Sequence, residues 1–152
     1  MQKRRTVAAV AVGVLLLDQL TKTWAERGLA DGPIHLFWTI SLRLTYNSGA
    51  AFSSGRGLTP FITAGAVIVL VVLIGLTRST TTRLGLIALG LLIGGATGNL
   101  FDRFFRDNGG AVIDFVDMEW WPVWNVADAA VVIGAGLLIL SSRREPVRHD
   151  GN

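Results

Sequence analysis

The stretch LTPFITAGAVIVLVVLIGL, residues Leu58–Leu76, decides the fold class of this chain because none of its side chains is charged. A helix of about 20 apolar residues is long enough to cross the hydrocarbon core of a bilayer. The 19 residues of this stretch therefore predict a membrane-spanning helix.

Three further apolar runs have a similar length. They cover about Thr6–Trp24, interrupted by Asp18, then Leu84–Leu100, and about Val123–Leu140, with Asp128 near its start. The glycines in the later runs allow helices to approach closely in lipid. The chain has 152 residues, 51% of them hydrophobic, and a mean hydropathy of +0.50. These properties predict a single all-α membrane domain (1–152) with four transmembrane helices, at about 6–24, 58–76, 84–100 and 123–140.

Composition excludes several kinds of site. The chain has no cysteine, so it has no disulfide, thiol nucleophile or thiolate metal ligand. Its two histidines, His35 and His149, lie too far apart in the chain to suggest a zinc site, and we expect neither a metal nor a cofactor. The net charge of +3 does not predict a nucleic-acid partner, because the basic residues lie in short flanks between apolar runs.

The distribution of lysine and arginine predicts the orientation in the membrane. One side would carry Lys3, Arg4, Arg5, Arg78, Arg83, Arg143, Arg144 and Arg148. Because basic residues favour the cytoplasmic side, we expect both termini there and the connections 1–2 and 3–4 outside. The first run also resembles a cleaved signal peptide, but Asp18, Gln19 and Lys22 stand where small cleavage-site residues would be expected.

The connection between the first two spans has the pattern of a β-structure. From Ile34 to Tyr46 every even position is apolar, and the odd positions are mostly polar. Such alternation predicts an amphipathic sheet, which we expect to lie on the membrane surface with its apolar face toward lipid. The alternative is a half-buried hairpin in an exterior domain, for which the connection is too short.

Polar residues gather near the predicted outer ends of the spans. Asp18 and Lys22 stand four residues apart, as in a structural ion pair or a substrate-orienting pair. The segment 47–52, which begins with Asn47 and contains Gly49, permits close backbone approach or forms a turn. If the third helix continues past Leu100, its polar residues Asn99, Asp102 and Arg103 fall on one face.

Two further carboxylates lie in apolar surroundings. Asp114 follows Val112-Ile113, and Asp128 shares a helical face with Asn125 at the start of the fourth run. An acidic residue at the centre of a membrane helix costs about 2.5–3.5 kcal/mol on insertion scales, so such residues mark functional sites. Two carboxylates that share one proton can activate water against an amide, and the pair predicts a membrane-embedded aspartyl peptidase.

Taken together, five blocks resemble the lipoprotein signal peptidase (signal peptidase II) family. They are Asp18-Gln19-Leu20-Thr21-Lys22, Asn47-Ser48-Gly49-Ala50-Ala51-Phe52, Gly94-Gly95 through Asp102-Arg103, Val112-Ile113-Asp114-Phe115 and Asn125-Val126-Ala127-Asp128. They occur in the family's order and cover most of the chain. One departure is a longer stretch before Asp114, with Asp107-Asn108-Gly109-Gly110 as an inserted turn.

The resemblance implies an enzyme of the bacterial plasma membrane that removes signal peptides from prolipoproteins. It would cut just before a cysteine that carries diacylglyceryl, near the extracytoplasmic surface, and the macrocyclic peptide globomycin would bind across the site. We expect a monomer whose partners are the lipidated substrate and membrane lipids.

The resemblance also assigns roles to residues. Asp114 and Asp128 would be catalytic, with Asn47, Gly49, Asn99, Arg103 and Asn125 at the substrate and the dyad, and with Asp18 and Lys22 in support. Asp102 competes with Asp114 for the catalytic assignment. We prefer Asp114, because Arg103 and a helix end explain Asp102.

Two other classes of function use the same residues. A small transporter or proton-coupled channel would use Asp18, Asp114 and Asp128 as relays. The polar residues cluster on one outer side, however, and the second and third spans carry no charge. A non-catalytic membrane scaffold leaves Asp128 unexplained.

Overall fold

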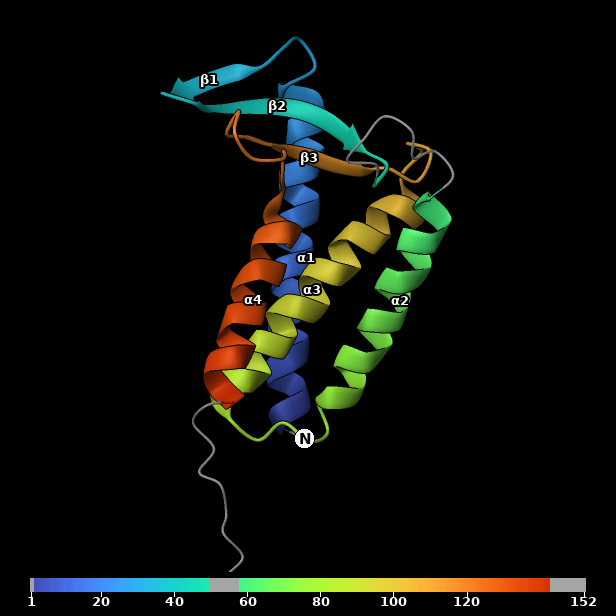
Figure 1. Cartoon of the computed structure of the whole chain (residues 1–152), viewed down its shortest axis with the longest axis vertical. Helices are drawn as coiled ribbons and strands as arrows, with labels where there is room; N and C mark the ends of the chain where they lie inside the picture. Colours follow the sequence, from blue (N-terminus) through green and yellow to red (C-terminus); the bar gives the residue numbers. More distant parts are fainter. Residues whose placement is uncertain (1, 50–57, 143–152) are drawn as a thin grey trace, which may run out of the picture.

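The computed structural model describes residues 2–49 and 58–142 of the chain (Figure 1). The helices in this part are α1 (Gln2–Gly28), α2 (Thr59–Leu76), α3 (Arg83–Phe105) and α4 (Val126–Ser142). The strands are β1 (Ile34–Phe37), β2 (Ile40–Asn47) and β3 (Val112–Asp117). The sheet lies across one end of the helices, and the N-terminus of α1 lies at the opposite end (Figure 1).

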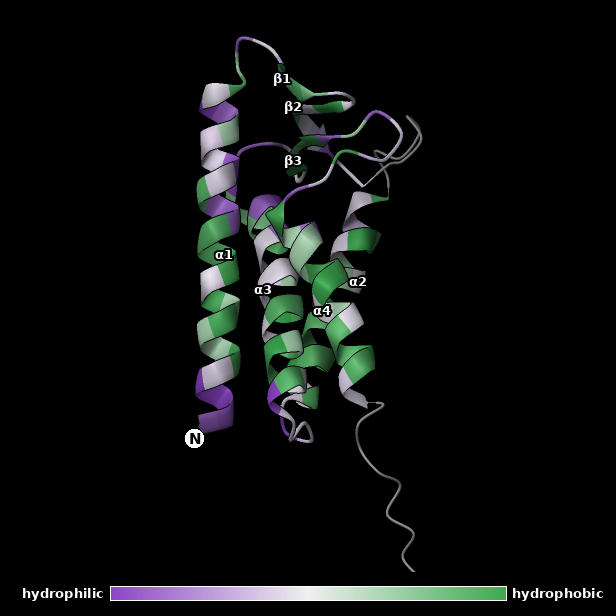
Figure 2. Ribbon diagram, turned by 90° about the vertical axis from the view of Figure 1, so that its left-hand side faces the viewer, coloured by the Kyte–Doolittle hydropathy of each residue, from purple (hydrophilic) through white to green (hydrophobic). Residues whose placement is uncertain are grey.

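The helices have the length and surface of membrane spans. α1, α2 and α3 are long and apolar enough to cross a bilayer, and α4 is apolar but shorter, at 17 residues. Of the residues of α2 only Leu73 is buried, so nearly all of its apolar surface faces outward. Figure 2 shows apolar residues along the helices and polar residues gathered toward their ends. The protein is therefore a membrane protein with several spans, and the fourth span remains a prediction.

The helix boundaries differ from the predicted spans in informative places. α3 continues to Phe105, which meets the condition that brings Asn99, Asp102 and Arg103 onto one face. The prediction that the fourth helix begins at about Val123 was wrong, because α4 begins at Val126. The backbone of Trp124 instead pairs with that of Val116, so the chain remains extended up to the helix.

The sheet contains a strand that the sequence did not predict. Its order is β1-β2-β3 with antiparallel pairs, and β3 comes from the connection between α3 and α4. The apolar face of β2 is also only partly free to face lipid, because Leu42 and Leu44 pack against Ala25, Leu29 and Phe115. The sheet is thus attached to α1, and through β3 it carries Asp114 over the helix ends.

Glycines let the backbones of neighbouring helices approach α3. A Cβ atom on Gly95 would lie 2.5 Å from the carbonyl oxygen of Ala127 in α4, and one on Gly94 would lie 2.8 Å from that of Ala11 in α1. A Cβ atom on Gly134 in α4 would likewise lie 3.0 Å from the carbonyl oxygen of Ala88 in α3. Small residues at such crossings allow close packing in lipid, and here they set the distance between α3 and the start of α4.

Gly95→Ala is therefore expected to destabilise the protein by about 1–3 kcal/mol, because the added methyl group must push α4 away from α3. The matched control is Gly65→Ala in α2, where nothing lies within 4 Å of the added atom. Thermal unfolding in detergent checks the difference. Equal midpoints for the two variants would show that the crossing tolerates a methyl group.

Candidate active site

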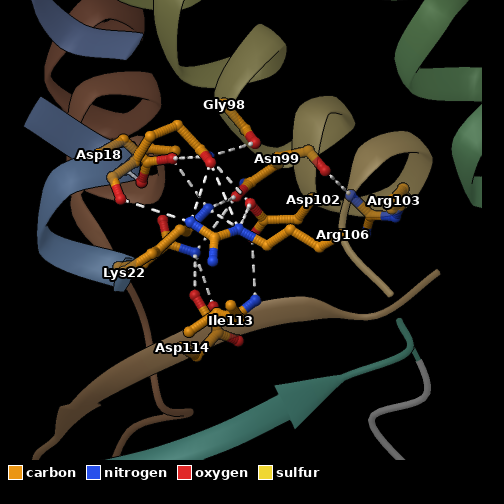
Figure 3. A network of polar contacts seen from close by, with 12 residues as sticks. Asp18, Lys22, Gly98, Asn99, Asp102, Arg103, Arg106, Ile113 and Asp114 are labelled. Atoms are coloured by element: carbon orange, nitrogen blue, oxygen red, sulfur yellow. Dashed lines mark hydrogen bonds and ion pairs between the residues drawn. The ribbon is translucent and has the colours of Figure 1, made fainter. Parts of the chain in front are cut away.

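A lysine buried between two aspartates forms the base of the site (Figure 3). The Nζ atom of Lys22 lies 2.9 Å from Oδ2 of Asp18 and 2.8 Å from Oδ2 of Asp102, and all three side chains are 0% exposed. The predicted pair of Asp18 and Lys22 is confirmed, with Asp102 as its third member. The cluster links α1 to α3, and removal of any one member would leave an uncompensated charge buried between them.

Asp102 has a different explanation from the predicted one. Its partners among the described residues are Lys22, the Gln19 amide at 2.9 Å, the Ile113 backbone N–H at 3.0 Å and Arg106 at 3.3 Å. Arg103, the expected partner, instead donates to the Asn99 carbonyl oxygen at 3.1 Å. All of these contacts hold Asp102 between α1, α3 and β3, and the choice of Asp114 over Asp102 as the catalytic residue stays a prediction.

The sequence analysis did not single out Gln19 and Arg106. The Gln19 amide donates to Asp18, Asp102 and the Gly98 carbonyl oxygen. Arg106 binds Glu26 and Gln19, and so closes the cluster from the side of the sheet. In the sequence, only their positions relative to the two aspartates could have suggested a role in the cluster. Gln19 follows Asp18, and Arg106 stands four residues after Asp102.

Asn99 connects this cluster to Asp128. Its side-chain oxygen accepts a hydrogen bond from Lys22 at 3.0 Å, and its amide nitrogen donates to Oδ1 of Asp128 at 2.9 Å. The lysine fixes which end of the amide faces Asp128, because an ammonium group can only donate. Asp18 acts on the same helix end, since its Oδ1 accepts from the Ala127 backbone N–H at 3.0 Å.

Asp128 is held by a reciprocal cap at the start of α4. Asn125 precedes the helix, and its side-chain oxygen accepts from the backbone N–H of Asp128 at 2.9 Å. Oδ2 of Asp128 accepts from the backbone N–H of Asn125 at 3.2 Å. This arrangement is a capping box, which satisfies two N–H groups of the helix end and explains why α4 begins at Val126 rather than at about Val123.

Asp114 reaches the same asparagine from β3. The Asn125 amide donates to its Oδ1 at 2.6 Å, and the Asn47 amide from β2 donates to its Oδ2 at 3.0 Å. The backbone N–H of Gly49 donates to the side-chain oxygen of Asn47 at 2.8 Å and so orients that amide. Gly49 has a φ of +84°, a conformation that suits glycine. Ala50, Ala51 and Phe52 of the same block lie outside the described residues.

Asp114 and Asp128 therefore share Asn125 as a common neighbour, although they come from a strand and a helix. Asp114 is only 2% exposed, and its burial raises its pKa to about 6, an effect that the hydrogen bond from Asn47 opposes. The negative charge of Asp128 raises the pKa further. Burial and a neighbouring carboxylate are the two features that let a carboxyl group hold a proton near neutral pH.

The raised pKa predicts a pH dependence of stability. The folded protein binds the Asp114 proton more tightly than the unfolded chain, whose value is 3.8, so stability falls as pH rises from about 4 to 6. The shift corresponds to about 3 kcal/mol, or roughly 5–10 °C in the unfolding midpoint. Thermal unfolding between pH 4 and 7 should show this decrease in the wild type and a smaller one in Asp114→Asn. Identical pH dependences would contradict the raised pKa.

Two further features border the carboxylates. Nε of Arg103 is buried and has no hydrogen-bond partner among the described residues. A groove of about 450 Å³ opens beside Asp128, and it is lined by Met118, Trp120, Trp121, Trp124, Ala129, Val132 and Ile133. The site thus offers carboxylates, amide donors and a cation next to an almost wholly apolar surface. Within residues 2–49 and 58–142, no three His, Asp or Glu side chains are grouped to hold a metal ion.

Comparison with known proteins relates this arrangement to one family. Residues 10–144 match the model of the signal peptidase (SPase) II family. The chain is 44% identical over 144 residues to the lipoprotein signal peptidase of Rhodococcus jostii, covering 91% of this chain and 73% of the relative. It is 43% identical over 146 residues to that of Mycobacterium tuberculosis, covering 93% and 72%.

Solved structures agree with the sequence match. A bacterial membrane enzyme determined by the in meso method at 2.3 Å resolution aligns with a TM-score of 0.81 and 25% identity, covering 97% of this chain and 93% of that one. Another, at 1.9 Å, aligns with a TM-score of 0.78 and 26% identity, covering 93% and 94%. The family match extends over the whole polar cluster and over Asp114 and Asp128, and the chain belongs to the signal peptidase II family of membrane peptidases.

Proposed function

We propose that the protein removes signal peptides from diacylglyceryl-modified prolipoproteins, and that it cuts just before the lipidated cysteine. The observation that carries this proposal is the placement of Asp114 and Asp128 around one asparagine, beside an apolar groove. The names of the relatives, which are lipoprotein signal peptidases, support the choice of substrate. The active site would then lie near the extracytoplasmic surface of the bacterial plasma membrane, with both termini in the cytoplasm.

In the proposed mechanism, Asp114 and Asp128 form an aspartyl dyad that holds one proton. The raised pKa of Asp114 favours this residue as the proton carrier. The carboxylate of Asp128 takes a proton from water, and the resulting nucleophile attacks the scissile carbonyl carbon. Protonated Asp114 donates a hydrogen bond to the carbonyl oxygen as negative charge develops there. The proton gained by Asp128 then passes to the departing amine, which breaks the C–N bond.

The neighbouring residues would position the substrate. Arg103 is half-buried, and its guanidinium group can bind a backbone carbonyl group of an extended peptide. Asn47, Asn99 and Asn125 hold the two carboxylates at fixed orientations, so little rearrangement is needed on binding. The lipid on the substrate cysteine would remain in the bilayer, and the apolar groove beside Asp128 gives the substrate a dry surface next to the reacting bond.

The function is tested with purified protein in detergent, incubated with a diacylglyceryl-modified precursor and with the same precursor without lipid. We expect a shorter product from the lipidated precursor alone, and inhibition by globomycin. Because no step requires association of two copies, a monomer should have full activity. An intact lipidated precursor after long incubation would exclude the proposed peptidase activity and favour the alternative function as a transporter.

A further inference from the structure

A second hollow lies at the end of the molecule opposite the proposed active site. α1 and α2 both pack against α3, but in the described part of the chain they do not pack against each other. A groove of about 400 Å³ remains between them, with Val7, Ala8 and Ala11 on one wall, Ile74 on the other and Ile93 of α3 contributing to the lining. The N-terminus of α1 and the connection between α2 and α3 lie together at this end (Figure 1).

Two arginines line the groove where it reaches the helix ends. They are Arg4, in the first turns of α1, and Arg78, which follows α2. Neither makes an ion pair or a side-chain hydrogen bond with another described residue, although Lys3 donates to the Thr80 carbonyl oxygen. An adjoining hollow of about 440 Å³ is lined by the same two arginines together with Gln2, Lys3 and Thr77.

The electrostatics of this end favour an anion. None of the residues 2–11, 74–94 and 131–142 is acidic, so the described part of this end holds no carboxylate to neutralise the arginines. The N-terminus of α1 adds the positive end of a helix dipole and free backbone N–H groups close to Arg4. Membrane orientation explains why basic residues lie on this side. It does not require two of them, from different helices, to share one apolar groove.

We infer that this groove binds an anionic phospholipid. The lipid phosphate would lie between the guanidinium groups of Arg4 and Arg78, and an acyl chain would run along Ala8, Ala11 and Ile74. Arginine suits phosphate because its planar donors match the oxygen positions. Basic pockets between membrane helices on the cytoplasmic side are suited to anionic headgroups. A zwitterionic lipid fits less well, because its cationic group would approach two arginines.

Native mass spectrometry of the purified protein tests the inference, with phosphatidylglycerol and phosphatidylcholine titrated separately. We expect tighter binding of phosphatidylglycerol, and a loss on the order of tenfold in Arg4→Gln/Arg78→Gln. The matched control is Arg5→Gln/Arg83→Gln, which removes the same charge from the same end and should change binding by less than about twofold. Neither of these residues lines the groove.

A third variant tests the acyl part of the site without changing the charge. Ala8 is exposed and lines the groove, so Ala8→Trp should fill it and weaken binding of both lipids while leaving the unfolding temperature near that of the wild type. Equal binding of the two lipids by the wild type, or equal losses in the two arginine pairs, would overturn the inference in favour of a diffuse surface charge. Because the readout is lipid binding, failure of the proposed peptidase activity would not affect it.

Discussion

Asp114→Asn is expected to lower the turnover of a lipidated precursor by about 10³-fold or more, because it removes the proton donor to the scissile carbonyl. Asparagine has nearly the same shape, and its oxygen can still accept one of the two hydrogen bonds that now come from Asn47 and Asn125. The fold should therefore survive. The measurement is product formation on a gel, with thermal unfolding as the test of integrity.

Asp128→Asn should have an equally large effect on turnover through the loss of the base that activates water. The new side-chain oxygen can still accept from the backbone N–H of Asn125, so the cap of α4 is retained in part. A folded but inactive protein is the expected result. Normal turnover in either variant would remove that aspartate from the mechanism.

The matched control for the proposed dyad is Asp117→Asn, three residues after Asp114 in the same strand. Its carboxylate pairs with Arg43, 2.7 Å away, and touches none of the residues around Asp114. Turnover should stay within about twofold of the wild type, because neither reacting carboxylate is changed. Asp102→Asn should weaken activity through the buried cluster. If it proved completely inactive while Asp114→Asn cleaved normally, the first member of the dyad would be Asp102.

The sequence predicted the helices well because lipid imposes a simple rule on them. A span must satisfy its backbone hydrogen bonds internally and present apolar side chains outward, so long uncharged runs mark α2 and α3 without knowledge of their neighbours. The strand β2 was also predicted, since alternation from Ile40 to Tyr46 is a local signal. The same rule marks the candidate site, because an aspartate such as Asp128 in an otherwise apolar run is costly in lipid and therefore suggests a functional role.

The features that the sequence did not predict depend on distant partners. β3 is buried along nearly its whole length, so its residues show no alternation, and its pairing with β2 joins positions about 70 apart in the chain. The salt bridge between Lys22 and Asp102 joins α1 to α3. The sequence around Lys22 shows only the nearby Asp18 as a partner and gives no sign of the second partner on another helix. The late start of α4 follows from the pairing of Trp124 with Val116, which is also a tertiary contact.

Lys22→Met is expected to destabilise the protein by about 3–5 kcal/mol, which is the second large effect that the structure predicts. Methionine fills a similar volume but leaves Asp18 and Asp102 buried without their shared cation. The unfolding midpoint in detergent should fall by roughly 10 °C or more. Activity should fall as well, because the Asn99 side chain that holds Asp128 loses one of the two donors to its oxygen and keeps only the Asn125 amide.

Two comparisons separate the loss of charge in Lys22→Met from the change in packing. Lys3→Met makes the same substitution at an exposed position of α1 and should change stability by less than about 0.5 kcal/mol. Adding Asp18→Asn and Asp102→Asn to Lys22→Met should recover part of the lost stability, because neutral amides then replace the two unpaired carboxylates. If the triple variant were less stable than Lys22→Met alone, the hydrogen bonds of the two carboxylates, rather than the lysine charge, would be what holds α1 against α3.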